Sequence, residues 1–244
     1  MKIASIQKQS LIEYPGKISA VIFIAGCNFR CPFCYVKDLV LPERIAKIKG
    51  ISEKEVLGFL KERKGFLEAA AISGGEPTIH KELPDFIKKI KKIGYLVELE
   101  TNGTNPEMLK RLIDEKLIDY AAIDVKQDFI FEKWHEITGR VLTRELFENI
   151  KKSIKILLKG KIDYELKTTL IKEFHKKEDI IEICKKISPA RKGFSNGAYY
   201  LQNFEKTEGG TISEKEFTPF SEKEIREIIE EGKKYANIKS RPYL

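Results

Sequence analysis

Three of the four cysteines lie together in one short stretch, "GCNFRCPFCY", which covers residues 26–35. Cys27, Cys31 and Cys34 have the spacing Cys-x3-Cys-x2-Cys. In a reducing compartment, clustered thiols are more often metal ligands than disulfides. A structural zinc site normally has four protein ligands, and catalytic metal sites leave one position open. The spacing therefore predicts a metal centre with one coordination position that the chain does not fill.

A fourth ligand from elsewhere in the chain is not indicated. Cys184 lies in the helical pattern "DIIEICKKI", which predicts a small buried side chain rather than a ligand. His80, His135 and His175 lack the close spacing of zinc-binding histidines. An iron–sulfur cluster explains the number of thiols better, because four thiolates complete a cluster of four irons and three leave one iron for an external ligand.

The elements that must position this loop alternate between strands and helices. Parallel strands with helices packed outside follow from such alternation, so the sequence predicts an α/β fold. The expected strands are Val21–Ala25, Ala69–Ser73, Leu96–Thr101, Tyr120–Val125, Tyr164–Ile171 and Ala198–Phe204. One domain is expected over residues 1–244, with a short lead-in over 1–18 and a helical extension over about 205–244.

The helix ends carry clear signals. "SEKE" occurs at Ser52 and again at Ser221, and each copy predicts a capping box at the start of a helix. Asn105 before Pro106 predicts another start, and Gly94 predicts an end. The remaining helices are expected over residues 83–93, 143–159 and 177–187, where apolar residues recur at helical spacing.

The unusual residues of the chain follow the strands. The cysteine stretch comes after the first strand, "GGEPT" after the second and "TNG" after the third. "DVK" ends the fourth strand, "KTT" lies in the fifth and "LQNF" in the sixth. In α/β folds of parallel strands, chemistry gathers at the carboxyl ends of the strands. The sequence therefore predicts one shared site.

Composition and charge exclude some classes of protein and leave others open. Hydrophobic residues make up 42% and charged residues 34% of the 244 residues, as in a folded, well-solvated protein. The net charge of +8 would attract nucleic acid, but lysines interspersed with glutamates on helix faces explain it better. With no membrane-length apolar run and no signal peptide in the sequence, we expect a cytoplasmic protein with neither membrane nor nucleic-acid partners.

The cysteine spacing with Phe33 between the last two thiols resembles the signature of the radical S-adenosylmethionine enzymes. The resemblance implies a partial (β/α)6 TIM-like barrel and a [4Fe-4S] cluster held by Cys27, Cys31 and Cys34. It also implies that the open iron binds the amino and carboxylate groups of S-adenosylmethionine. One electron then cleaves this cofactor to methionine and a 5′-deoxyadenosyl radical, so no catalytic side chain beyond cluster and cofactor is expected.

The same resemblance implies which residues contact S-adenosylmethionine. "SGGEPT" is similar to the family's second motif, in which glycine backbone binds the methionine amino group; Gly74 and Gly75 would allow close approach while Glu76 anchors the turn. Asp124 would hold the ribose and Lys126 the methionine carboxylate, although an ordinary surface salt bridge is the alternative. The full expected set is Phe33, Cys34, Tyr35, Gly74, Gly75, Glu76, Thr101, Asn102, Asp124, Val125, Lys126 and Gln202.

Within the family, "IDVKQ" and "WHEITG" resemble segments of glycyl-radical-enzyme activating enzymes, in which the His-x-x-Thr-Gly stretch lies on a loop. "SLIEYPGKISAVIFIAGC" is similar to the start of anaerobic ribonucleotide-reductase activases. The implied partners are a glycyl-radical enzyme, anaerobic ribonucleoside-triphosphate reductase, and a low-potential electron donor such as flavodoxin or ferredoxin. Tyr35-Val36, Glu100 and Gln202 depart from residues common in relatives, which weakens the assignment of the partner.

Two other functions are open to such a sequence. A radical S-adenosylmethionine enzyme acting on a small molecule or on RNA would share the cysteine loop, and the positive charge would favour RNA. A non-enzymatic zinc or electron-transfer module would need four protein ligands and would bind no S-adenosylmethionine.

Overall fold

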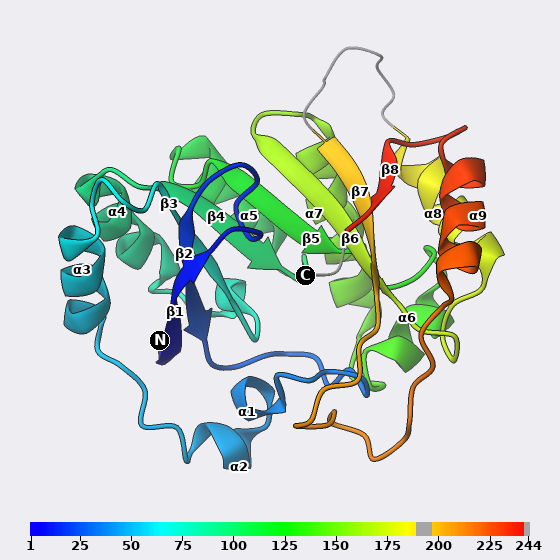
Figure 1. Cartoon of the computed structure of the whole chain (residues 1–244), viewed down its shortest axis with the longest axis horizontal. Coiled ribbons are helices and arrows are strands. Elements are labelled where there is room, and N and C mark those ends of the chain that lie inside the picture. Colours follow the sequence, from blue (N-terminus) through cyan, green and yellow to red (C-terminus); the bar gives the residue numbers. More distant parts are fainter. Residues whose placement is uncertain (189–196, 242–244) are drawn as a thin grey trace. The chain divides into compact units, whose positions relative to one another are not determined.

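The computed structural model describes residues 1–188 and 197–241 of the chain. The chain forms two compact units. Figure 1 labels their helices and strands. Unit 1 comprises Met1–Asn28 and Val36–Ala122, and unit 2 comprises Phe29–Tyr35 and Ile123–Leu244. The stretch of residues 26–35, called the cysteine loop below, therefore contributes Cys27 to unit 1 and Cys31 and Cys34 to unit 2.

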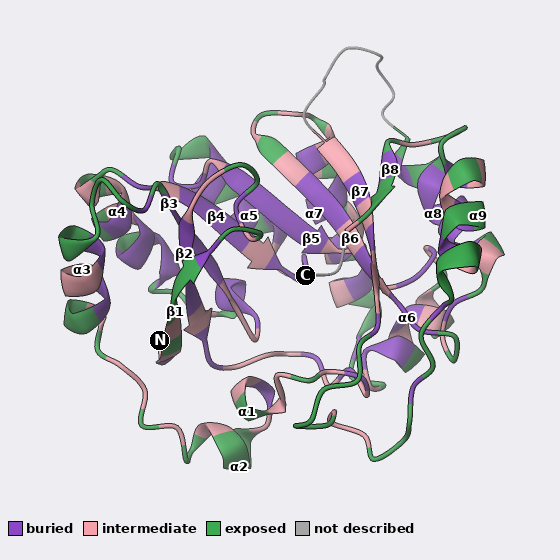
Figure 2. Cartoon of the chain, in the orientation of Figure 1, coloured by how far each residue is buried: buried purple, intermediate pink, exposed green. Residues whose placement is uncertain are grey.

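The strands of unit 1 follow one another in chain order, and the β2–β3 and β3–β4 pairs are parallel. They are β1 Ile3–Ser10, β2 Ser19–Ile24, β3 Ala69–Gly74, β4 Leu96–Thr101 and the start of β5 Tyr120–Asp124. The apolar runs of β2 and β3 are buried along most of their length, as Figure 2 shows. β1 pairs antiparallel with β2. It was not predicted, because its polar sequence "IASIQKQS" is that of an exposed edge strand.

The helices of unit 1 are α1 Lys37–Val40, α2 Pro42–Ile45, α3 Glu53–Glu62, the 3-10 helix η1 Pro77–Ile79, α4 Leu83–Ile93 and α5 Pro106–Asp114. Three helix ends of this unit lie where their capping residues predict, and α1 and α2 were not predicted. Ser52 forms the predicted capping box with Glu55. Asn105 caps α5 through Met108 N, at 3.1 Å, and Gly94 ends α4 with a positive φ of 96°. These predictions are confirmed.

Unit 2 continues the parallel pattern. Its strands are the end of β5, then β6 Asp163–Leu170, β7 Gly197–Asn203 and β8 Ile238–Ser240, with β6–β7 and β7–β8 parallel. Its helices are α6 Phe131–Ile137, α7 Arg144–Leu158, α8 Lys177–Ile187 and α9 Glu222–Gly232. α8 packs against α9, and α9 packs against β8. The predicted helical extension therefore contains a strand as well as a helix.

The six predicted strands are all present, and the predicted α/β fold with parallel strands is confirmed. Cys184 is fully buried in α8, with its Sγ against Gly232 of α9, so its predicted place in the core is confirmed. No helix within residues 1–188 and 197–241 has the length and apolar character needed to cross a membrane. The expectation of a single domain stays a prediction.

Candidate functional site

In unit 1, the residues on either side of Cys27 are bonded to the two motifs that follow β3 and β4. Gly26 O accepts a hydrogen bond from Glu76 N at 2.7 Å. Asn28 Oδ1 accepts one from Asn102 Nδ2 at 2.8 Å. The start of the cysteine loop is thus tied to "GGEPT" and to "TNG", as expected of residues at the carboxyl ends of parallel strands.

The two glycines of "GGEPT" lie against the end of β2. A Cβ on Gly75 would be 2.0 Å from Gly26 O, and a Cβ on Gly74, whose φ is +122°, would be 2.4 Å from Ile24 O. No side chain fits either position, because the obstacle is backbone. Close approach of the cofactor was the predicted reason for glycine at these positions. In the structure, the group that approaches closely is the chain's own backbone, at Ile24 O for Gly74 and at Gly26 O for Gly75.

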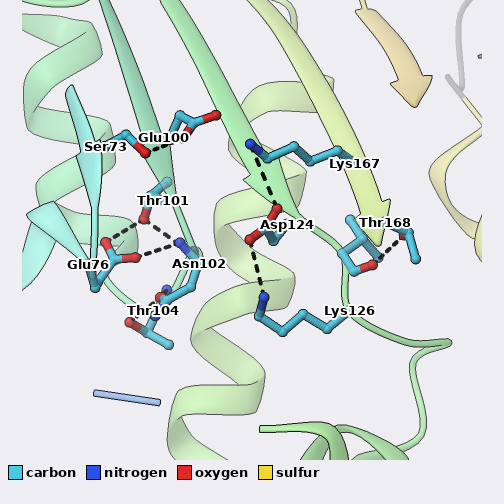
Figure 3. A network of polar contacts seen from close by, with 12 residues as sticks. Ser73, Glu76, Glu100, Thr101, Asn102, Thr104, Asp124, Lys126, Lys167 and Thr168 are labelled. Atoms are coloured by element: carbon cyan, nitrogen blue, oxygen red, sulfur yellow. Dashed lines mark hydrogen bonds and ion pairs between the residues drawn. The ribbon is translucent and has the colours of Figure 1, made fainter. Parts of the chain in front are cut away.

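Glu76 is fully buried and accepts hydrogen bonds from four donors of unit 1, and Figure 3 shows those from Thr101 and Asn102. The four donors are Thr78 N at 3.0 Å, Thr78 Oγ1 at 2.5 Å, Thr101 Oγ1 at 2.6 Å and Asn102 N at 2.6 Å. Burial raises the pKa of Glu76, while each of these donors lowers it. Three of these donors bond to Oε1 and one bonds to Oε2, so Glu76 joins the turns after β3 and β4 through both of its oxygens. Its predicted role as the anchor of the turn is confirmed.

In unit 2, the second part of the cysteine loop packs on the end of "WHEITG". Arg30 N donates to Thr138 O at 3.0 Å, and a Cβ on Gly139 would lie 2.1 Å from Arg30 O. Cys34 N donates to Cys31 O at 3.0 Å, which closes the loop into a turn. The implied loop conformation of the whole stretch is wrong, because "WHEI" belongs to α6 and only its Thr-Gly end lies outside the helix.

The predicted pair at the end of β5 is an ion pair of low exposure. Lys126 Nζ lies 3.1 Å from Asp124 Oδ2, and Lys167 Nζ lies 4.0 Å from the other oxygen (Figure 3). The side chains of Lys126 and Asp124 are 12% and 35% exposed, so this is not the ordinary surface salt bridge considered as an alternative. Between the two, Val125 is fully buried and donates its N–H to Lys167 O at 2.8 Å.

The charges around this pair shift its pKa values. Burial by itself lowers the pKa of Lys126, but Asp124 and the nearby thiols raise it well above its ordinary value. Burial raises the pKa of Asp124, while Lys126 and Lys167 lower it, with a net fall. The Lys126 ammonium also lies 5.8 Å from the centre of the Phe33 ring. The aromatic residue of the cysteine loop and the Asp-Val-Lys segment therefore meet within unit 2.

The thiols fit the donor set of an iron–sulfur cluster. Cys27, Cys31 and Cys34 are all free of disulfides. Burial raises the pKa of Cys31 to about 11, and the Lys126 ammonium opposes this rise. Three thiols suit a cluster that keeps one iron open. In the described part of the chain, no three His, Cys, Asp or Glu side chains are already grouped around one metal position.

Two of the expected cofactor residues lie apart from these contacts. Tyr35, at the end of the cysteine loop, is 59% exposed. Gln202 is half-buried in β7, where it pairs with Thr169 of β6. Their contacts with a cofactor stay predictions.

Sequence reasoning missed several residues that hold these parts in place. Asn28 was visible inside the cysteine loop but carried no motif of its own. Lys167 lay in the noted "KTT" stretch, yet its ion pair with Asp124 depends on the pairing of β6 with its neighbour. His175 and Phe174, described below, gave no signal, because single aromatic residues in a loop have no periodic pattern.

These features define a class of enzyme, and comparison with known proteins names it. The family model described as "Radical SAM superfamily" matches residues 21–187, and the chain belongs to this superfamily. It is a radical S-adenosylmethionine enzyme of α/β fold, and the family uses a [4Fe-4S] cluster and S-adenosylmethionine.

Among similar proteins is one of Methanocaldococcus jannaschii whose name provisionally assigns it to the glycyl-radical enzyme activating enzymes. It is 34% identical over 238 residues, which cover 96% of this chain and 92% of that protein. The 7-carboxy-7-deazaguanine synthase of Aquifex aeolicus is 30% identical over 174 residues, 63% of this chain and 73% of that one. The solved structure of a radical SAM methyltransferase from Sphaerobacter thermophilus shares the fold, with a TM-score of 0.69 and 14% identity over 93% of this chain and 67% of that one.

Proposed function

We propose that this enzyme generates a glycyl radical on a partner protein. The observation that carries the proposal is the 34% identity with the M. jannaschii protein, because it extends over 96% of this chain and 92% of that one. Similarity confined to the cysteine motif would be expected of any member of the family. Similarity over the whole length also includes the segments that distinguish one member from another.

The contacts within unit 2 add support. The Thr-Gly end of "WHEITG", a stretch that resembles the activating enzymes, bonds directly to the cysteine loop through Arg30. "DVK" reaches the same loop through Lys126 and Phe33. The two stretches that indicated an activating enzyme are therefore part of the surroundings of the thiols.

We assign roles to the residues as follows. Cys27, Cys31 and Cys34 hold the cluster. Asp124 binds ribose hydroxyls and Lys126 the methionine carboxylate, since these pairings satisfy charge and hydrogen bonding. The remaining contacts to S-adenosylmethionine come from Phe33, Tyr35, Gly74, Gly75, Glu76, Thr101, Asn102, Val125 and Gln202, with Glu76 acting through the turns that it joins.

Bound together, the cluster and S-adenosylmethionine supply a carbon radical that accepts a hydrogen atom. The partner glycine loses that atom from its Cα, and its radical is delocalised over the flanking amide groups. One electron from a low-potential donor, flavodoxin or ferredoxin, is consumed for each cofactor cleaved to methionine and 5′-deoxyadenosine. We name anaerobic ribonucleoside-triphosphate reductase as the partner, on the resemblance of residues 10–27 to its activases.

The test is to mix the reduced, iron-loaded protein and S-adenosylmethionine with candidate glycyl-radical enzymes under anaerobic conditions. Electron paramagnetic resonance should show a doublet from the glycyl radical. The doublet should be absent with the Cys31→Ala variant, or when the partner's radical glycine is replaced by alanine. Cofactor cleavage without a doublet on any candidate partner would contradict the proposal.

A second candidate is an enzyme that acts on a small heterocycle. The similarity to the A. aeolicus protein favours this candidate, because the two chains are 30% identical over 63% of the present chain. In that case, adding the small-molecule substrate should raise the rate of cofactor cleavage. Deuterium from that substrate, and not from a protein glycine, should appear in 5′-deoxyadenosine.

A further inference from the structure

The segment between β7 and α9, residues 204–220, is called the strap below. It belongs to unit 2 and bonds to the backbone of the cysteine loop. Ile212 N donates to Cys34 O at 3.1 Å, and Ser213 N donates to Pro32 O at 2.8 Å. Residues 205–210 of the strap are exposed. An exposed chain with little regular structure stays in one place only where specific contacts hold it.

Phe217 supplies that anchor. It is 4% exposed, and its ring lies 6.4 Å from Phe33, 5.9 Å from Phe174 and 5.8 Å from Phe204, measured between ring centres. Phe33 and Phe174 also contact each other at 6.0 Å. Aromatic pairs at such distances add to the stabilisation from burial alone. Phe217 therefore touches the residue that lies between the second and third thiols.

The same cluster holds the segment that carries Lys126. Gln127 Nε2 donates to Phe174 O at 2.5 Å, and His175 Nε2 lies 2.7 Å from Lys126 O. Because a carbonyl oxygen can only accept, we assign the proton to Nε2, which donates to Lys126 O. Phe174 and His175 thus connect the aromatic cluster to the Gln127 side chain and to the backbone carbonyl of Lys126.

We propose that Phe217 is a positioning residue for the cysteine loop. It anchors the strap across Pro32–Cys34 and packs on Phe33, so that retention of the cluster depends on a segment that supplies no ligand. Partners that orient metal ligands affect metal affinity about 10- to 100-fold when they are removed. A loop released by its strap opens more often, and each opening exposes the thiolates to exchange.

The first experiment compares Phe217→Ala with Phe220→Ala in the iron-loaded full chain. Phe220 is the matched control, because it is a buried phenylalanine of the same strap whose ring lies 5.6 Å from the Lys172 ammonium. The measurement is the rate of iron release to a ferrous chelator, with the folded fraction checked by circular dichroism. We expect release about 10- to 100-fold faster from Phe217→Ala than from Phe220→Ala, and partial recovery in Phe217→Leu.

A spectroscopic readout separates positioning from general loss of stability. The electron paramagnetic resonance spectrum of the reduced cluster, with and without S-adenosylmethionine, should change in Phe217→Ala and stay unchanged in Phe220→Ala. Equal release rates and equal spectra in the two variants would overturn the proposal.

A second pair of variants tests the backbone hydrogen bonds between the strap and the cysteine loop. This pair tests the proposal even if Phe217→Ala does not fold. Ile212→Pro removes the N–H that donates to Cys34 O. Glu208→Pro is its control, because Gly210 N donates to Thr207 O and proline is favoured at the position that Glu208 takes in this turn. Iron release should rise in Ile212→Pro alone, and wild-type release from it would contradict the role of the strap. None of these measurements needs a partner, so failure to find a glycyl radical would leave them unaffected.

Discussion

The Glu76 carboxylate of unit 1 accepts four hydrogen bonds from the chain itself, whereas the Asp124 carboxylate of unit 2 remains partly exposed between two lysines. Glu76 follows β3 and Asp124 is the last residue of β5, and both came from motifs seen in the sequence. Their surroundings nevertheless differ in kind. Backbone N–H groups and threonine hydroxyls surround Glu76, whereas the ammonium groups of two lysines lie beside Asp124.

This difference distinguishes Glu76, which shapes the site, from Asp124, which can bind a ligand there. Glu76 is fully buried and both of its oxygens accept hydrogen bonds from the chain, so its contribution is the form of the turns after β3 and β4. The ammonium groups of Lys126 and Lys167 each carry three donors, and an ion pair can exchange one carboxylate for another. Asp124, Lys126 and Lys167 can therefore exchange partners and bind a ligand, whereas the Glu76 carboxylate is held by hydrogen bonds within the chain.

The largest expected effect distinguishes thiols that hold a cluster from one that fills the core. Cys31→Ala should lose nearly all of the iron that the reconstituted wild-type protein binds, because two thiolates cannot hold a cluster. Cys184→Ala, the control, should keep its iron, since Cys184 packs against Gly232 in unit 2. Iron and sulfide analysis checks both. Full iron content in Cys31→Ala would remove the assignment of the cluster.

A second prediction concerns the satisfied carboxylate. In Glu76→Gln, an amide NH2 group replaces an acceptor oxygen, and a buried donor left without its acceptor costs about 1–3 kcal/mol. Urea unfolding should show this loss in the free energy of unfolding. Glu62→Gln, on the exposed face of α3, should be nearly neutral. A small effect at Glu76 would mean that its hydrogen bonds are replaceable.

The third prediction concerns binding at the other carboxylate. Lys126→Met keeps the length of the side chain but removes the charge proposed to bind the cofactor carboxylate. We expect the affinity for S-adenosylmethionine to fall about tenfold or more, equal to about 1.4 kcal/mol, with the iron content unchanged. Lys133→Met is the control, because Lys133 joins Asp128 and Asp179 within unit 2. Equilibrium dialysis under anaerobic conditions measures both. Unchanged affinity in Lys126→Met would contradict its assigned role.

The fourth prediction is a pH dependence that arises at His175. Burial lowers the pKa of His175, Lys126 adds to this, and Asp179 together with the backbone hydrogen bonds opposes it. Below the ordinary histidine pKa of about 6.5, the unfolded chain takes up a proton that the folded chain does not. The free energy of unfolding should therefore fall as the pH drops below about 6.5, by at most about 1.4 kcal/mol per pH unit from this group.

Denaturant unfolding at a series of pH values measures this slope. His175→Gln should lower the stability at neutral pH and reduce the slope between pH 7 and pH 5, since glutamine does not titrate. An identical slope in the variant and the wild type would show that other groups cause the pH dependence.

The smallest effects come from the repeated "SEKE" sequence, which forms a capping box once in each unit. Ser52→Ala and Ser221→Ala should each reduce the free energy of unfolding by about 1 kcal/mol. In unit 2 the Glu224 carboxylate has a further partner, since Lys172 Nζ lies 2.8 Å away and, with Ser221, lowers its pKa to about 2. A double variant should show additive losses, because the two helices belong to different units.

Local features of the fold were predictable because their causes are local. The capping boxes at Ser52 and Ser221, the Asn105 cap and the Gly94 end each depend on a few consecutive residues, and all have the predicted form. β1 and β8 were missed for the opposite reason. Each is an edge strand or a short strand whose existence depends on a neighbour, and its own sequence has no clear apolar alternation.

The candidate site was predictable in its parts but not in its supports. The cysteine spacing and the motifs after the strands indicated where to look, because the carboxyl ends of parallel strands carry the chemistry. That Asn28 bonds to Asn102, and that Phe217 packs on Phe33, could not be read from spacing. Such pairs join residues far apart in the chain, and nothing in either residue's own neighbourhood specifies its partner.

The sequence alone determined the number of thiols, the alternation of strands and helices, the helix ends and the charged and glycine residues after each strand. These depend on the chemistry of each residue and on short-range hydrogen bonding. Only the tertiary structure decided that the Glu76 carboxylate bonds to the turns after β3 and β4, that Lys126 and Lys167 both pair with Asp124, and that the strap bonds to the cysteine loop. Burial and packing set those outcomes, and both depend on which distant segments the fold brings into contact.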